Sequence, residues 1–240
     1  MKNQLMYKEY AKYYDLIYSW KNYKKEADKI NKLINFYKKS NGLDLLEVAC
    51  GTAHHLKYLK NKFNCSGIDI NQGILDVAKK KFPDINFKKA DMVNFKFGKK
   101  FDIITCLFSS IGYVKTEANL RKTINNFASH LKQGGVVIIE PWFTKSAYRV
   151  GFPHMTTYES KELKIARLNV SKVKGNLSIM DMHFLVAEKD KEMKYFIDRH
   201  EMGMFGTDKI SQIMKEAGLK AKFLKKGFME ERGLFVGIKE

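Results

Sequence analysis

Cysteine and proline are scarce in this chain, and each shortage excludes a class of protein. Only three of its 240 residues are cysteine and three are proline, which excludes a disulfide scaffold and a proline-rich array. Cys50, Cys65 and Cys106 lie on or beside expected strands without metal-ligand spacing, so we expect reduced structural thiols and no metal site. No apolar run is long enough to cross a bilayer, and the first residues carry no signal-peptide core. We therefore expect a cytoplasmic protein with no membrane partner.

Acidic residues are in the minority, at 26 against 44 lysines and arginines, which gives a net charge of +18. Such a charge favours nucleic acid or another polyphosphate as a partner. Few of the basic residues are arginine, however, and the lysines are spread along the chain rather than gathered in one stripe. This spread argues against nucleic acid and leaves a small substrate that carries a diphosphate, or a compositional bias, to explain the charge.

Hydrophobic periodicity predicts alternating strands and helices. An amphipathic helix is expected at 21–39 and ends at Ser40-Asn41-Gly42. We expect strands at 43–49, 65–70, 85–90, 101–107 and 135–140, and helices at 53–62, 72–81 and 117–131. This order predicts an α/β fold in which helices cover both faces of a parallel sheet.

The rhythm changes after residue 140. Three β runs are expected at 162–173, 176–188 and 191–204, followed by a helix at 207–217 and strands at 219–226 and 233–239. The sequence therefore predicts three segments. These are an N-terminal helical cap with an α/β core over 1–140, an inserted antiparallel β segment over 141–204, and the completion of the core over 205–240.

The first strand leads into a turn typical of nucleotide-binding sites. An apolar run ends at Glu47 and is followed by Ala49-Cys50-Gly51-Thr52-Ala53. Asp69 ends the next strand, about 20 residues after the turn, where a carboxylate commonly holds a ribose, and Asp91 ends the third strand. Alanine disfavours positive φ, so the alanines predict that the turn does not need three left-handed residues. The absence of a strict Gly-x-Gly-x-x-Gly argues against NAD.

Three acidic strand ends beside such a turn resemble the class I S-adenosylmethionine (SAM) methyltransferases. The resemblance implies a Rossmann-like mixed seven-stranded sheet with helices on both faces, an inserted antiparallel β sub-domain, and SAM as the cofactor. It implies that the first turn holds the methionine part of SAM, Asp69 the ribose and Asp91 the adenine. The cofactor-binding residues implied in full are Tyr14, Tyr23, Ala49, Gly51, His55, Asp69, Ile70, Asp91, Met92 and Leu107.

Further segments narrow the resemblance. They are Tyr14-Asp15-Leu16-Ile17-Tyr18, Leu107-Phe108-Ser109-Ser110-Ile111-Gly112-Tyr113, Glu140-Pro141-Trp142 and Arg232-Gly233-Leu234-Phe235-Val236-Gly237. In this order they resemble the N,N-dimethyltransferases of dTDP-linked 3-amino-3,6-dideoxyhexoses, the desosamine and mycaminose type. Ala53 replaces the usual third glycine, Phe143 replaces a second tryptophan, and the loop 144–160 looks different, which leaves the acceptor open.

The resemblance implies in-line methyl transfer to the amine of a dTDP-linked amino deoxysugar. Its catalytic residues would be Tyr113, Tyr7 and Glu140, and its substrate-binding residues Phe108, Ser109, Trp142, Arg167 and Arg232. Packing or a surface ion pair is the alternative role for each of them, and His183 and His200 are expected to be structural or on the surface.

Two alternative functions remain. One is SAM-dependent methylation of another small molecule. The other is methylation of RNA or protein, against which the absence of an Asn/Asp-Pro-Pro-Tyr/Phe motif after the fourth strand argues. The inserted β segment is expected to form either a homodimer interface or a lid over the acceptor.

Overall fold

The computed structural model describes residues 4–240, so the first three residues of the expected N-terminal segment lie outside it. Its main sheet has seven strands in the order β10-β11-β5-β4-β1-β2-β3. The parallel strands are β1 (Asp44–Val48), β2 (Asn64–Asp69), β3 (Asn86–Lys89), β4 (Phe101–Cys106) and β5 (Leu131–Ile139). β10 (Leu219–Leu224) and β11 (Leu234–Lys239) form an antiparallel hairpin on the β5 edge. The predicted mixed seven-stranded sheet is confirmed.

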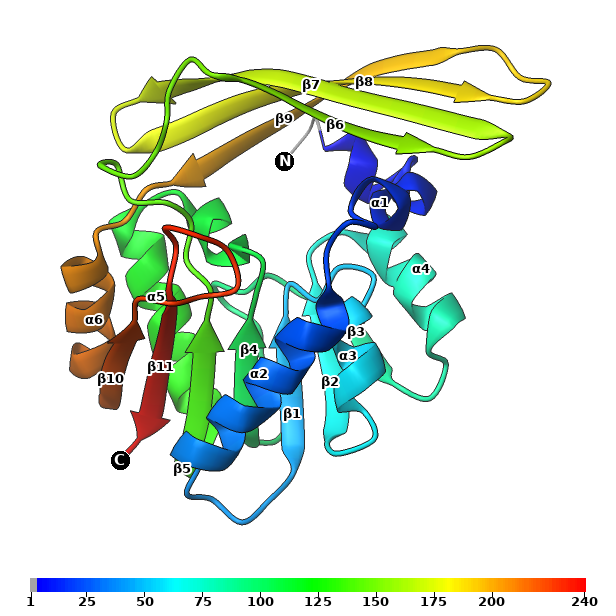
Figure 1. Ribbon diagram of the computed structural model, residues 1–240. Helices are drawn as coiled ribbons and strands as arrows, with labels where there is room; N and C mark the ends of the chain where they lie inside the picture. Colours follow the sequence, from blue (N-terminus) through cyan, green and yellow to red (C-terminus); the bar gives the residue numbers. More distant parts are fainter. Residues whose placement is uncertain (1–3) are drawn as a thin grey trace.

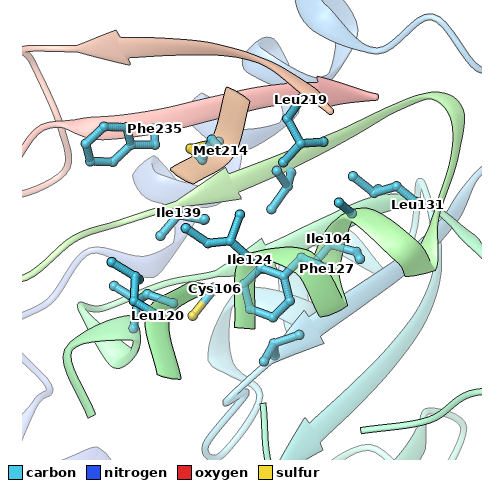
Figure 2. Close-up of a cluster of buried hydrophobic side chains, with 14 of the residues drawn as sticks. Ile104, Cys106, Leu120, Ile124, Phe127, Leu131, Ile139, Met214, Leu219 and Phe235 are labelled. Carbon is cyan, nitrogen blue, oxygen red and sulfur yellow. The ribbon is translucent and has the colours of Figure 1, made fainter. Parts of the chain in front are cut away.

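Helices cover both faces of this sheet (Figure 1). On one face α5 (Glu117–His130) and α6 (Thr207–Glu216) pack on a cluster that includes Ile104, Phe127 and Phe235 (Figure 2). On the other face α2 (Tyr23–Tyr37), α3 (His54–Leu59) and α4 (Gln72–Lys81) pack against the opposite side chains of β1, β4 and β5. The strands are therefore buried on both faces, as their near-continuous apolar runs predict.

A second, four-stranded sheet lies between β5 and α6 in the chain. It consists of β6 (Pro153–Glu159), β7 (Leu163–Lys174), β8 (Leu177–Glu188) and β9 (Lys194–Gly203), in that order and antiparallel throughout. Figure 1 shows it lying across the carboxyl ends of the parallel strands. The sequence predicted three β runs where four strands exist. β6 was missed because it is a mostly exposed edge strand and lacks apolar alternation.

The N-terminal segment joins the two sheets. It forms the 3-10 helix η1 (Leu5–Tyr7) and the helix α1 (Ala11–Ile17). Met6, Tyr13 and Ile17 pack with Phe184 and Phe196 of the inserted sheet in a third apolar cluster. Burying side chains of this size on one surface contributes roughly 1.5–3 kcal/mol each, so the cap and the inserted sheet stabilise each other.

The other side of α1 is tied to the turn after β1. Asp15 accepts a hydrogen bond from Thr52 Oγ1 at 2.5 Å, lies 2.9 Å from His54 Nε2, and pairs with Lys81 of α4. Over residues 4–240, no helix has the length and apolar character that crossing a bilayer requires. The cap thus spans the space between the two sheets, next to the carboxyl ends of β1 and β2.

Candidate active site

The turn after β1 is left-handed at three residues: Ala49 (φ 55°), Gly51 (φ 55°) and Ala53 (φ 64°). The prediction that alanine rules out three left-handed residues is therefore wrong. A left-handed alanine costs roughly 1–2 kcal/mol, and hydrogen bonds hold the turn against that cost. The Gly51 N–H donates to Asp69 Oδ2 at 3.1 Å, and the Ala53 N–H donates to the carbonyl of Cys50 at 2.9 Å.

A first cavity of about 160 Å³ opens at the carboxyl ends of β1, β2 and β3. Asp69 lines it, accepts the Asn71 N–H at 2.9 Å and is buried enough that its carboxyl pKa is raised. Asp91 lines it too and accepts the Val93 N–H at 2.9 Å. The predicted cofactor residues that line this cavity are Tyr14, Ala49, Gly51, Asp69, Ile70, Asp91 and Met92.

These lining residues fit the adenosine part of SAM. Two carboxylates at adjacent strand ends can accept hydrogen bonds from ribose hydroxyls and an adenine amine. Ile70, Ile74 and Val93 supply apolar surface for a flat ring. A Cβ at Gly51 would have no neighbour closer than 4.0 Å, so the turn leaves its backbone open to a ligand.

A second cavity of about 370 Å³ adjoins the first and extends under the inserted sheet. Aromatic side chains, methionines and two arginines line it. Seven more of the predicted residues are found here: Tyr23, His55, Leu107, Phe108, Trp142, Arg167 and Arg232. Six residues line both cavities, namely Tyr7, Tyr14, Ala49, Gly51, Ser110 and Tyr113. A group held between the three tyrosines would therefore face both spaces.

The two arginines of the second cavity form no ion pair with any residue from 4 to 240. Arg167 donates to Tyr18 Oη at 3.0 Å and to Thr156 Oγ1 at 2.7 Å. Arg232 donates to Ser109 Oγ at 3.1 Å and stacks 4.6 Å from the ring of Trp142. The buried Nε of each arginine has no hydrogen-bond partner in the described chain. Both guanidinium groups therefore have N–H donors and a positive charge that an anion could use.

Glu140 and Ser109 lie behind the cavities rather than in their walls. Glu140 is fully buried, which raises the pKa of its carboxyl, and its Oε2 accepts the Phe108 N–H at 2.6 Å. Ser109 Oγ donates to the carbonyl of Pro141 at 2.7 Å. Phe108 (φ 49°) and Ser109 (φ 62°) are both left-handed. Glu140 is predicted to be catalytic and Ser109 to bind substrate, but the contacts that they make here hold the strained loop after β4.

His55 is held between two carboxylates, with Nε2 2.8 Å from Glu26 and Nδ1 3.2 Å from Glu47. Burial lowers the pKa of His55, but the hydrogen bonds with Glu26 and Glu47 outweigh it and raise the pKa to about 9. Tyr23 stacks on His54 with ring centroids 4.6 Å apart. Both predicted cofactor residues face the second cavity, next to the turn, and not the first.

Tyr113 belongs to a hydrogen-bonded chain that sequence reasoning missed. Its hydroxyl lies 3.1 Å from Tyr7 Oη and 2.6 Å from His200 Nδ1, and His200 Nε2 lies 3.0 Å from Asp198 Oδ2. His200 was expected to be structural or on the surface, but it is 4% exposed and lines the second cavity. The only signal in the sequence was the i, i+2 spacing that puts Asp198 and His200 on one face of a strand.

The comparisons with known proteins agree with this geometry. Residues 45–135 match a methyltransferase domain family. The chain is 34% identical to a Streptomyces venezuelae protein described as dTDP-3-amino-3,4,6-trideoxy-alpha-D-glucopyranose N,N-dimethyltransferase, over 96% of this chain and 98% of the relative.

Solved structures agree as well. The crystal structure of Streptomyces venezuelae DesVI matches with a TM-score of 0.90 at 34% identity, over 96% of this chain and 98% of that one. The SAM-bound structure of CalS10, an amino pentose methyltransferase from Micromonospora echinaspora, matches with a TM-score of 0.82 at 26% identity, over 92% of each chain. Fold, enzyme class and cofactor are therefore those that the sequence predicted, and the chain belongs to the SAM-dependent N,N-dimethyltransferases of dTDP-linked amino sugars.

Proposed function

We propose that this enzyme transfers the methyl group of SAM to the amine of a dTDP-linked amino deoxysugar. One observation carries the proposal: the cavity with the acidic strand ends and the cavity with the arginines meet at Tyr7, Tyr14 and Tyr113. A cofactor in the first cavity and a sugar in the second would bring methyl group and amine together at this junction.

We assign the cofactor to the first cavity. Ala49 and Gly51 allow the turn to approach the methionine part, Asp69 accepts from the ribose hydroxyls, and Asp91 accepts from the adenine amine. When bound, SAM supplies a methyl group that its positive sulfur already activates. The protein then has to align an amine lone pair behind that methyl group, and such positioning can supply roughly 7–11 kcal/mol of the barrier. Tyr14 lines both cavities where they meet, so its ring would lie beside the reacting groups.

We assign the nucleotide diphosphate of the acceptor to Arg167 and Arg232. Guanidinium groups bind phosphate oxygens with paired N–H donors, and both arginines have buried donors without partners. Trp142 and Phe108 offer rings on which a base or a sugar face can stack. The net charge of +18 would also draw a dianionic nucleotide sugar toward the cavity.

We also propose where the enzyme works and how it assembles. We place the reaction in the cytoplasm, because Cys50, Cys65 and Cys106 are free thiols, which suits a reducing compartment. We assign the outer face of the inserted sheet to a homodimer interface. We also retain 1–140, 141–204 and 205–240 as the three segments of the chain.

Calorimetric titration with S-adenosylhomocysteine, repeated with dTDP and with a dTDP-amino sugar, tests the function. We expect binding of all three in wild type and at least a tenfold loss of S-adenosylhomocysteine affinity in Asp69→Ala. The exposed Asp84→Ala is the matched control. Unchanged affinity in Asp69→Ala would refute the cofactor assignment. Binding of S-adenosylhomocysteine without the nucleotide sugar would point to another small acceptor.

Arg232 tests the diphosphate assignment separately. Arg232→Gln should raise the KM for a dTDP-amino sugar about 10- to 100-fold, because a charge-assisted hydrogen bond contributes about 1.5–3 kcal/mol. The KM for a free amino sugar should change little. Arg121→Gln on the far side of α5, which removes a surface ion pair with Glu216, is the control. An equal rise in KM for both acceptors would show that Arg232 does not bind the diphosphate.

A further inference from the structure

The described chain contains a buried His–Asp pair that the assigned cofactor and phosphate contacts leave unused. Asp198 and His200 are successive inward-facing residues of β9, and their exposed fractions are 0% and 4%. Asp198 also accepts the N–H of Met6, at 3.5 Å. Tyr113 links this pair by a hydrogen bond to the point where the two cavities meet.

The hydrogen bonds assign a direction to the chain. An ionised carboxylate only accepts hydrogen bonds, so the Asp198 contact places the proton of a neutral His200 on Nε2. His200 Nδ1 is then an acceptor, and the Tyr113 hydroxyl donates to it across 2.6 Å. The oxygen of Tyr113 turns its lone pairs toward Tyr7 and the cavity, where it can accept an N–H.

Among the described residues, the elements packed around Asp198 bring no charged side chain to it other than His200. β8 places Met180 beside His200 and Met182 beside Asp198, so the neighbouring strand adds no charge there. Asp181 and Arg199 alternate to the opposite face and pair with each other at 3.2 Å. From the cap, η1 contributes Tyr7 and the amide of Met6, both uncharged. A proton that arrives on His200 would therefore meet one dedicated counter-charge.

We propose that His200 and Asp198 act through Tyr113 to accept the proton that the acceptor amine must lose before methyl transfer. The inference rests on the proposed function and adds the fate of this proton. Burial raises the pKa of the Tyr113 phenol well above its ordinary value. A phenolate is therefore unfavourable here, and the phenol would pass a proton on while it stays neutral. Tyr113 contacts the amine, and the His–Asp pair positions its hydroxyl.

A sugar amine arrives mainly as ammonium at neutral pH. One N–H proton passes to Tyr113 Oη while the phenolic proton passes to His200 Nδ1, which leaves an imidazolium beside Asp198. With SAM bound, the freed lone pair would attack its methyl carbon, the C–N bond would form, and the electrons of the C–S bond would go to sulfur. After product release the proton returns through Tyr113 to water in the open cavity.

The experiment compares His200→Gln, Asp198→Asn and Tyr113→Phe with wild type on a dTDP-amino sugar. For His200→Gln and Asp198→Asn we expect the S-adenosylhomocysteine affinity and the KM of the acceptor within about threefold of wild type, and for His200→Gln a kcat at pH 7 at least about 100-fold lower. The deficit should shrink as pH rises, because more of the amine arrives already deprotonated. His130→Gln, at the end of α5, is the control and should keep the wild-type pH profile.

Two other outcomes overturn the proposal in different ways. A wild-type kcat and pH profile in His200→Gln, or a loss that is the same at every pH, means that the pair carries no proton. A wild-type enzyme that binds S-adenosylhomocysteine but methylates no sugar amine refutes the proposed function, and the relay with it. If His200→Gln loses S-adenosylhomocysteine binding, and so its fold, Asp198→Asn and Tyr113→Phe decide the same question by the same pH profile.

Discussion

At the scale of single residues, His55 links the site to stability. Its folded pKa of about 9 exceeds the unfolded value of roughly 6.5, so its stabilising contribution is complete below pH 6.5 and is lost as pH rises through 9. The free energy of unfolding should fall by roughly 3 kcal/mol between those pH values. Denaturant unfolding of wild type, His55→Gln and the control His130→Gln across pH 6–9.5 checks this. The same slope in His55→Gln would show that another group titrates.

Single residues also show what could and could not be predicted from the sequence. The shared location of Asp69 and Asp91 in one cavity was predictable, because strand ends in a parallel sheet meet at one edge, a rule that needs no coordinates. The burial of His200 at the second cavity was not predicted, because its contact with Tyr113 depends on β9 lying next to η2 (Ser110–Val114), a tertiary contact that no local pattern records. The three left-handed residues of the turn were missed for a related reason. Hydrogen bonds that the Gly51 and Ala53 N–H groups donate to Asp69 and to the carbonyl of Cys50 hold the turn and outweigh the intrinsic preference of alanine.

At the scale of elements, the close packing of α4 against the cap makes Gly73 a test of how the cavity is closed. A Cβ at Gly73 would lie 2.7 Å from the carbonyl oxygen of Lys8, between η1 and α1. Gly73→Ala should therefore displace the segment that carries Tyr7 and Tyr14 and weaken S-adenosylhomocysteine binding about tenfold. Helix propensity favours alanine by up to about 1 kcal/mol, so the melting temperature should change little.

Gly98→Ala provides the control for Gly73→Ala, because its added Cβ meets nothing within 4 Å. Unchanged ligand affinity in Gly73→Ala would mean that the cap yields without moving the tyrosines. The elements themselves were largely predictable, since the core helices and strands have strong periodicity and buried apolar faces. β6 was not, because an edge strand pairs through its backbone and needs no apolar side chains.

At the scale of the whole molecule, the outer face of the inserted sheet carries an exposed apolar patch. Leu168, Val170, Leu185, Tyr195 and Ile197 are each at least 41% exposed. Cross-strand pairing joins them, with Leu168 beside His183, His183 beside Ile197, and Leu185 beside Tyr195. An exposed apolar patch of this kind can mark an interaction site, and a second copy of the same sheet offers a matching surface.

Light scattering and sedimentation at micromolar concentration should therefore find a dimer. Ile197→Lys should shift it toward monomer, because the new charge would have to be buried in the interface. Lys220→Glu on β10, whose side chain is exposed and lies on the main sheet, should leave the dimer intact. A wild-type monomer at every concentration would exclude the dimer. Because the cap packs on the opposite face of this sheet, a monomeric Ile197→Lys that still binds S-adenosylhomocysteine would show that the cavities form within one chain.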